Sequence, residues 1–189
     1  MKKRVQKLHE ALVSEQMITY RIAAAAELKH YGYVVGVGAT FALIQVVDAN
    51  IVSLNGYIAV PLTEMRKVIL NDDDYLLHRA LEMKKIRPEP QPDILLLDFP
   101  GLLSSANAHF PLINVQVEYR WPDTCYIGRV DSLTKNRVRL REIDPEGQWS
   151  RNRSYQFKDI TRVEFGGGYE NALWMVAEHD RRRRSASQG

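Results

Sequence analysis

The chain has 189 residues, with 26 Lys or Arg against 23 Asp or Glu and a formal net charge of +3. The excess lies at the C-terminus, where residues 179–189 hold four consecutive arginines and one acid, while residues 1–178 carry 22 bases and 22 acids. This distribution excludes a protein that is basic over its whole surface. With 45% hydrophobic residues, the composition is that of a globular protein with one domain or two small ones.

A weak internal duplication in the sequence predicts the order of the secondary-structure elements. Three segments of the first half match three segments of the second half in the same order, two at an offset of 95 residues and one at 93. Small changes of offset are what short loop insertions produce, so the matches predict two copies of one folding unit. The matched pairs are residues 17–22 with 112–117, 33–37 with 126–130, and 61–68 with 156–163.

The first unit is predicted to open with a helix and to continue through four or five short strands. The apolar face of the helix is formed by Val5, Leu8, Ala11 and Leu12. Residues 23–26 are four alanines and favour a helix by propensity. We interpret them as the end of a strand instead, because their counterpart in the second unit, residues 118–122, is extended.

A closing helix is expected at Tyr75–Lys85, where the preceding residues 71–74 suit the cap of a helix N-terminus. Residues 87–97 begin with Arg-Pro-Glu-Pro-Gln-Pro, a stiff and extended linker. The second unit repeats the plan, with helices near Gly101–His109 and Glu170–His179. The predicted domains are residues 1–86 and 98–179, followed by a basic tail at 180–189 that we expect to be disordered.

A helix followed by a meander of short twisted strands within about 80–90 residues is the plan of a small barrel. The second unit resembles the Sm-like (LSm) small β-barrel family in three segments, residues 126–130, 136–140 and 159–163. Gly128 resembles the glycine at which the second strand of such barrels bends. The whole chain resembles a bacterial protein with two tandem Sm-like domains. The resemblance implies a mainly β fold of two tandem Sm-like/SH3-like small barrels with short helices, each with an N-terminal and a C-terminal helix.

The same resemblance implies RNA binding and ring assembly through exposed strand edges. The RNA pocket of the family uses an aromatic-Asp-x-x-Met-Asn turn and an Arg-Gly or Lys-Gly step. In this chain the turn is residues 131–136, Asp-Ser-Leu-Thr-Lys-Asn, and neither glycine step occurs anywhere. We therefore expect the shape of the family without its RNA-reading motifs.

The strand at residues 41–47 is apolar on both faces, a pattern typical of a strand that is covered on both sides. Its second face is expected to pack either on the other barrel or on a second chain. The predicted self-association residues are Phe41, Leu43, Ile44, Val46 and Val47.

The strand at residues 135–141 alternates sharply, with arginines on one face and apolar side chains on the other. Its charged face, together with aromatic residues of the same unit, can bind phosphates and stack bases. The interpretation we favour is a solvated face balanced by Glu142, Asp144 and Glu146, since residues 91–178 carry 10 bases and 12 acids. The candidate nucleic-acid-binding residues of the strand are Lys135, Arg137, Arg139 and Arg141, and the aromatic ones are Trp121, Tyr126, Trp149 and Tyr155.

The arginines of the tail add a second candidate site, with nonspecific affinity for nucleic acid that falls as salt rises. A solubilising terminus with no partner explains them equally well. The residues are Arg181, Arg182, Arg183 and Arg184.

Enzyme, cofactor and metal chemistry finds no support in the sequence. Gly36-Val-Gly38 lacks the third glycine and the helix of a dinucleotide loop. The five histidines are scattered, and the single cysteine, Cys125, is expected to be a small buried strand residue. With no disulfide, signal peptide or apolar spanning run, a cytoplasmic protein without membrane partner is expected.

The sequence thus predicts a non-enzymatic interaction or assembly protein that binds no cofactor, metal or small-molecule substrate and forms a homo-oligomer. The alternative is an RNA-binding protein that uses the arginine-rich strand and the C-terminal arginines.

Overall fold

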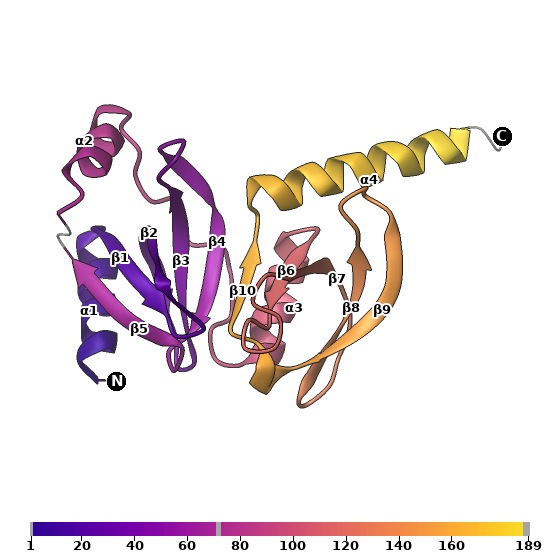
Figure 1. Ribbon diagram of the computed structural model, residues 1–189, viewed down its shortest axis with the longest axis horizontal. Helices are drawn as coiled ribbons and strands as arrows, with labels where there is room; N and C mark the ends of the chain where they lie inside the picture. The colour runs from indigo at the N-terminus through magenta and orange to yellow at the C-terminus, as the bar shows by residue number, and fades with distance from the viewer. Residues whose placement is uncertain (1, 71–72, 187–189) are drawn as a thin grey trace.

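A computed structural model describes residues 2–70 and 73–186. The described part contains four α-helices, a 3₁₀ turn and ten strands (Figure 1). The helices are α1 (Lys2–Ser14), α2 (Tyr75–Met83), α3 (Phe99–His109) and α4 (Gly168–Ala186), and the 3₁₀ turn η1 is Phe157–Asp159. The strands are β1 (Met17–Ile22), β2 (Ala25–Val37), β3 (Phe41–Asp48), β4 (Ser53–Pro61), β5 (Met65–Leu70), β6 (Ile113–Gln116), β7 (Cys125–Leu133), β8 (Arg137–Ile143), β9 (Trp149–Gln156) and β10 (Arg162–Phe165).

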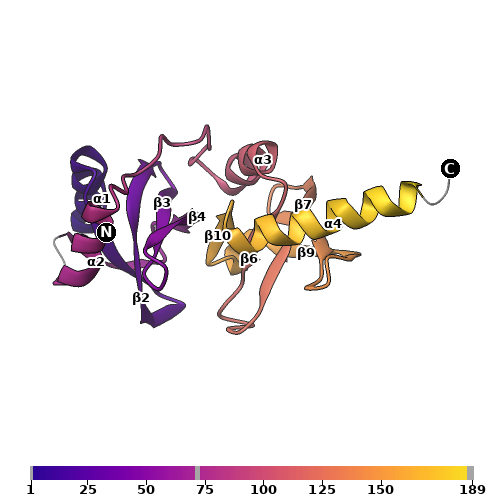
Figure 2. The same cartoon turned by 90° about the horizontal axis from the view of Figure 1, so that it is seen from above.

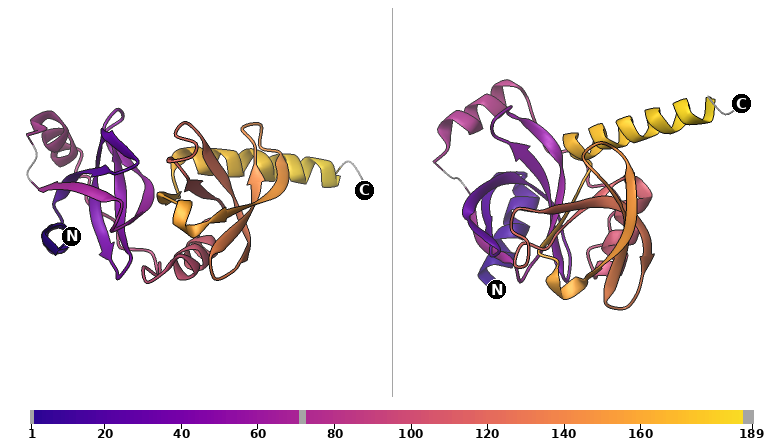
Figure 3. Two further views of the ribbon diagram at one scale, coloured as in Figure 1. Left: turned by 60° about the horizontal axis from the view of Figure 1, so that its bottom comes forward. Right: turned by 45° about the vertical axis from the view of Figure 1, so that its right-hand side comes forward.

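All ten strands belong to one antiparallel sheet with the order β5-β1-β2-β3-β4-β10-β6-β7-β8-β9. The first half has the order β5-β1-β2-β3-β4 and the second half β10-β6-β7-β8-β9. In both halves the last of the five strands along the chain therefore lies beside the first. The two halves join where β4 pairs with β10, through Val163 opposite Ala59 and Phe165 opposite Tyr57. Both halves curve strongly and lie side by side (Figures 1 and 3). A mixed α/β fold dominated by antiparallel strands agrees with the expected mainly β class.

The pairing registers confirm the duplication in detail. Equivalent residues differ by 95 in β1 and β6, where Ile18 and Ile113 correspond, and by 96 in β2 and β7. Irregularities in pairing recur at the same positions, after Val34 in β2 and after Val130 in β7. The predicted offset of 93 for this strand is wrong, because the stretch from Ile113 to its partner Gly128 is one residue longer than the stretch from Ile18 to its partner Gly32, rather than two residues shorter.

This register places Gly32 and Gly128 at the same position of the two halves, opposite Ile18 and Ile113. A Cβ atom at Gly128 would overlap the carbonyl oxygen of Arg141, and one at Gly32 would overlap the carbonyl oxygen of Gln45. Glycine is needed here because a neighbouring strand passes too close for any side chain. The special role expected for Gly128 therefore rests on close approach, and it occurs twice.

The helices begin and pack much as the sequence predicts. Leu8 and Ala11 bury one face of α1 in the first half. Asp74 caps α2 by accepting a hydrogen bond from the Leu77 backbone N–H at 3.3 Å. Asp98 caps α3 in the same way, from Gly101 at 2.8 Å. These caps satisfy backbone donors that a helix start leaves open.

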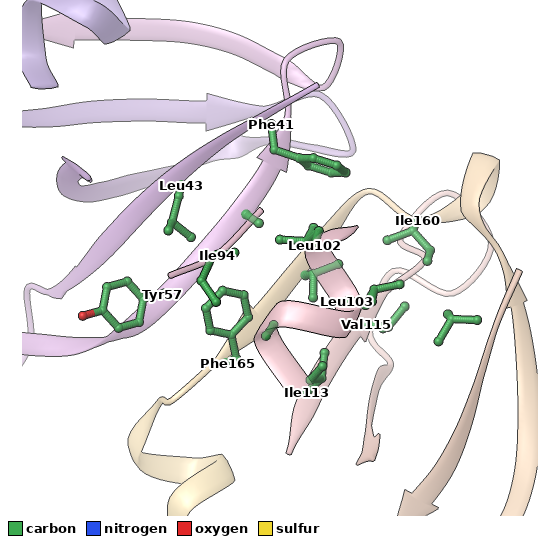
Figure 4. Close-up of a cluster of buried hydrophobic side chains, with 14 of the residues drawn as sticks. Phe41, Leu43, Tyr57, Ile94, Leu102, Leu103, Ile113, Val115, Ile160 and Phe165 are labelled. Atoms are coloured by element: carbon green, nitrogen blue, oxygen red, sulfur yellow. The ribbon is translucent and has the colours of Figure 1, made fainter. Parts of the chain in front are cut away.

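Two hydrophobic clusters make up most of the core. One lies inside the first half under α1 and contains Ile18, Tyr20 and Ile44. The larger cluster joins the interior of the second half to the outer face of β3 and β4, so that Phe41 and Leu43 pack with Leu102 and Leu103 of α3 (Figure 4). The halves therefore share one apolar core across the β4–β10 junction.

The linker at residues 87–97 contains no helix or strand, and contacts at Glu89, Ile94 and Leu96 anchor it to the rest of the chain. Glu89 binds Gln45 twice, through its backbone N–H at 2.8 Å and its carboxylate at 2.9 Å. Ile94 and Leu96 are buried in the shared core. The linker thus forms part of the junction between the halves.

Two local predictions need correction. Residues 23–26 do not end a strand: Ala23 and Ala24 form the turn after β1, and Ala25 begins β2. The tail is helical up to residue 186, because α4 continues from Gly168 to Ala186 and projects past the second half (Figures 1 and 2). Residues 187–189 lie outside the described part of the chain. No helix in the described residues combines the length and the apolar character needed to cross a membrane.

Candidate nucleic-acid interface

The arginine-rich strand is β8, and its faces alternate as predicted. Arg137, Arg139 and Arg141 are exposed, whereas Val138 and Leu140 are fully buried. Lys135 is exposed in the turn before the strand. On the same face, β9 contributes Gln156, Ser154 and Asn152 opposite the three arginines. The surface beside the arginines on this side is polar and uncharged.

The acids expected to neutralise this face are engaged elsewhere. Glu142 pairs with Arg153, at 3.6 Å between Oε1 and Nε. Asp144 accepts the backbone N–H groups of residues 146 and 148 in the turn after β8. Among the described residues, no ion pair joins Glu146 to the β8 arginines, and the one carboxylate that pairs with them is Asp131, 3.4 Å from Arg139. Among the described residues, Arg137 and Arg141 therefore form no direct ion pair with these acids, and the interpretation of a solvated, charge-balanced face stays a prediction.

Two arginines stand directly opposite each other at the upper end of this face, since Arg129 of β7 pairs in register with Arg141. Like charges opposite each other destabilise a sheet. Each guanidinium lies over an indole ring, Arg129 at 5.2 Å from Trp174 and Arg141 at 5.1 Å from Trp149. These stacking contacts offset part of the repulsion and hold the guanidiniums in place.

A concave site of about 450 Å³ lies at the free edge of β9. We call it the edge pocket. Its charged lining consists of four guanidiniums and one carboxylate, so its local charge is strongly positive although the second half is acidic by count. The arginines are Arg120, Arg137, Arg151 and Arg153, the acid is Asp159, and the aromatic lining residues are Trp121, Tyr126 and Tyr155.

Inside the edge pocket the side chains hold one another in fixed positions. The Tyr126 and Tyr155 rings lie 4.7 Å apart, and the Arg153 guanidinium lies 5.6 Å from the Tyr126 centroid. Tyr155 donates a hydrogen bond to Glu142. Burial and this hydrogen bond raise the pKa of Tyr155, so that it stays a donor at neutral pH. The nearby charge of Glu142 raises the pKa of Arg153.

Arg120 and Trp121 come from the loop between β6 and β7. The Arg120 guanidinium lies 3.3 Å from the Asp159 carboxylate, which ties the loop to the 3₁₀ turn. Trp121 is 57% exposed, an unusual state for the largest apolar side chain and the one expected of a stacking platform. Among the described residues, no carboxylate pairs with Arg137 or Arg151, so both remain available to an anionic ligand.

The edge pocket exists because β9 ends the sheet. The equivalent strand of the first half, β4, has its outer edge covered by β10, while no strand of the described residues pairs with the outer edge of β9. Sequence reasoning missed Arg120, Arg151 and Arg153 because it singled out β8 alone. The signal available was the second alternating basic stretch, Arg151-Asn-Arg153.

The predicted self-association strand is covered within the chain. Phe41 and Leu43 pack against the second half, one of the two coverings expected for them. Ile44 and the half-buried Val46 face the core of the first half, and Val47 packs against α2. These side chains therefore do not offer an apolar surface to a second copy.

The C-terminal arginines are exposed on the last turns of α4. Arg184 Nη2 donates to Gln148 Oε1 at 2.6 Å, which places this end of the helix beside the β8–β9 turn. Arg181 pairs with Glu178 at 2.9 Å. Helix α4 thus brings the C-terminal arginines to the same half as the arginine-rich strand β8. The C-terminal end of β8 lies between the edge pocket and these arginines.

Cys125 is exposed at the start of β7, which corrects its assignment as a buried residue. Although the residue as a whole is exposed, neighbouring groups partly shield its sulfur from solvent and raise the pKa of the thiol, which is the opposite of what activates a nucleophile. Within residues 2–70 and 73–186, no group of three His, Cys, Asp or Glu side chains is arranged to hold a metal ion.

Comparison with family models, with curated proteins and with solved structures finds no match to this chain.

Proposed function

We propose that this chain is a non-enzymatic, single-stranded-RNA-binding protein built from two tandem Sm-like small barrels, and that the second barrel binds the RNA. The observation that carries the proposal is the edge pocket, in which four arginines and an exposed tryptophan meet at an unpaired strand edge. Guanidiniums bind phosphates and aromatic rings stack on unpaired bases, and an extended single strand presents both.

The support for two barrels is the repeated strand order and register of the two halves. The support for RNA as the ligand is the combination of charge and aromatic rings. The exposed β8 arginines extend the positive surface from the edge pocket toward α4, in a row with the roughly 6.6–6.8 Å spacing of alternate strand residues. The ligand is bound mainly through its backbone and by stacking, since the family's base-reading motifs are missing.

The test is fluorescence anisotropy with labelled single-stranded oligonucleotides, on the full chain in low salt. The double variant Arg137→Ala/Arg151→Ala removes two unpaired guanidiniums and is expected to weaken binding about tenfold or more. Trp121→Ala is expected to weaken it by about 1–3 kcal/mol through lost stacking. The matched control is Lys2→Ala/Lys3→Ala, which removes the same charge from exposed residues of α1 in the first half.

Equal loss of affinity in the control pair would show that only net charge matters, and the proposed site would be wrong. Absence of binding to any oligonucleotide at low salt would overturn the proposed function itself. The absorbance ratio at 260 and 280 nm of the protein purified in low salt gives an independent check for bound RNA.

Self-association is a second candidate function, favoured by one observation. The free edge of β9 corresponds in register to the edge of β4 that pairs with β10, so β9 could pair with β5 of another copy. The edge of β5 that does not pair with β1 is already in contact with α1. Arg4 donates to the Met65 carbonyl there, and Lys7 donates to the Val68 carbonyl at 3.2 Å.

Light scattering of the wild type and of Lys7→Ala tests this candidate. If β5 is the receiving edge, removing the Lys7 contact increases the mass in solution toward a dimer or larger assembly. A monomer in both proteins at high concentration would overturn self-association while leaving the RNA proposal standing.

A further inference from the structure

A second concave site lies at the junction of the two halves, away from the edge pocket. This junction cavity has a volume of about 260 Å³ and lies between β1, β2 and β4 of the first half and β6, β10 and the start of α4 of the second. Its charged lining residues are Glu164 and Glu170, its neutral polar ones include His30 and Asn114, and its tyrosines are Tyr20, Tyr57 and Tyr169.

The carboxylates at this cavity outnumber the nearby cations. Arg162 is shared between Glu118, at 3.2 Å, and Glu164, at 2.8 Å. Within the described part of the chain, the buried Glu170 accepts one side-chain hydrogen bond, from the Asn114 amide at 3.3 Å. The N-terminus of α4 adds about half a positive charge beside Glu170. Three carboxylates against one guanidinium and a helix end leave the cavity negative.

Buried carboxylates are costly unless a positive group compensates them. Burial raises the pKa of Glu164, while the charge of Arg162 acts in the opposite direction. Asn114 is itself held between the two acids, donating to Glu164 at 3.1 Å and to Glu170. The arrangement fixes both carboxylates toward a common space, and of the two, among the described residues, Glu164 alone has an ion-pair partner, Arg162.

His30 provides an independent sign of a missing partner. Its Nε2 atom is buried and has no hydrogen-bond partner in the described residues. Burial and the charge of Arg162 lower the pKa of His30 to about 4, so the imidazole is neutral at physiological pH and can accept a hydrogen bond. The ring stacks on Tyr20 at 5.3 Å. An unsatisfied polar atom at a cavity wall is the expected position for a ligand contact.

Aromatic rings complete the lining. Tyr57 and Phe165 are stacked at 6.0 Å across the junction, one from each half (Figure 4). Tyr169 is exposed at the rim on the first turn of α4. Aromatic rings attract organic cations through their negative faces, whereas a metal ion requires a set of ligands that the described residues do not supply.

We propose that the junction cavity binds a small organic cation carrying N–H donors, of the guanidinium or primary ammonium type. The cation donates to the Glu170 and Glu164 carboxylates and to His30 Nε2, and its apolar faces lie against the tyrosine rings. Because the ligand contacts both halves, its binding stabilises the β4–β10 junction. The site is independent of the RNA-binding surface.

The test is an NMR titration with methylguanidinium at low millimolar concentration, following the ring protons of His30, with His30→Gln used to assign them. Saturable shifts with a Kd of about 1 mM or tighter are expected. Urea at the same concentrations is a neutral, planar control that also has N–H donors, and tetramethylammonium is a cation without N–H donors. Both are expected to bind at least tenfold more weakly.

Glu170→Gln removes the charge and keeps the shape, and it is expected to weaken methylguanidinium binding at least tenfold. Tyr169→Ala changes only the rim and is expected to weaken binding with an unchanged fold. Glu146→Gln, in the exposed β8–β9 turn, is the matched control and should bind as the wild type does. The proposal is overturned if the shifts do not saturate, if urea produces the same shifts, or if Glu170→Gln binds as tightly as the control.

Discussion

Phe41 and Arg137 occupy equivalent positions in the two halves of this chain. Phe41 stands opposite Pro61 in the β3–β4 pair, and Arg137 stands opposite Gln156 in the β8–β9 pair, at the same register. The same relationship joins Leu43 to Arg139, the next outward-facing pair. One face of the repeat is therefore an apolar docking surface in the first copy and a charged, exposed surface in the second.

This pair of positions gives a stability prediction. Phe41→Ala leaves a cavity in the shared core and is expected to lower the free energy of unfolding by about 3–5 kcal/mol. Arg137→Ala alters an exposed side chain and is expected to change it by no more than about 0.5 kcal/mol. Urea unfolding of the two variants measures the difference. Comparable losses in both would contradict the assignment of the two faces.

The glycines of β2 and β7 give a second prediction. Gly32→Ala and Gly128→Ala each force a Cβ into the backbone of the adjacent strand, and each is expected to cost about 1–3 kcal/mol or more. Gly168→Ala is the control, because its nearest contact would be an ordinary 3.6 Å to Asn55 Oδ1. Thermal unfolding compares the three. A neutral Gly128→Ala would mean that the strands do not approach so closely.

His30 predicts a specific dependence of stability on pH. Its pKa is lowered to about 4 in the folded chain from an ordinary value of 6.5, by burial first and then by the charge of Arg162. The unfolded chain therefore takes up the proton first, and the contribution of His30 to stability is lost as the pH falls from about 6.5 to about 4.

The measurement is the difference in unfolding free energy between the wild type and His30→Phe at pH 7, 5.5 and 4.5. The phenyl ring keeps the contact with Tyr20 and does not titrate, so effects of the other ionisable groups cancel in the difference. The wild type is expected to lose stability relative to the variant at each lower pH. A difference that stays constant with pH would contradict the pKa shift.

Salt dependence gives a prediction for the RNA-binding surface. The logarithm of the association constant should fall linearly with the logarithm of salt concentration, with a slope near −0.7 for each phosphate neutralised. Arg151→Ala removes one such contact, so its slope is expected to be shallower by about 0.7. Trp121→Ala should lower affinity at all salt concentrations with an unchanged slope. The reverse pattern would mean that the two residues have the opposite roles.

Local features of the fold were predictable because short-range patterns determine them. The alternation of charged and apolar residues around Arg137 predicts which face of the strand is buried. Asp74 directly before an amphipathic helix predicts an N-terminal cap. The duplication was visible at an offset of 95 because equivalent residues in β5 and β10 each face the core of their own half. The misplaced offset for β2 and β7 arose because tyrosine occurs at different positions in the two strands.

The edge pocket could not be predicted, since it depends on long-range pairing. Arg120 and Arg153 are 33 residues apart in the sequence and lie at one site only because β9 ends the sheet. Likewise, the sequence around Phe41 shows that its side chain is covered, but it does not show whether the second half or a second chain covers it. The helical state of residues 180–186 depends on contacts such as Arg184 with Gln148, which lies 36 positions earlier.

The packed linker bears on how the chain would respond to cleavage. Lys84 and Lys85 lie in an exposed segment ahead of Glu89, and neither residue takes part in the β4–β10 pairing or in the apolar core that joins the halves. A protease that cuts after Lys85 would break the covalent connection and leave every β4–β10 contact intact. The two fragments would then remain together as a heterodimer, and the same pieces expressed separately would reconstitute the protein when mixed.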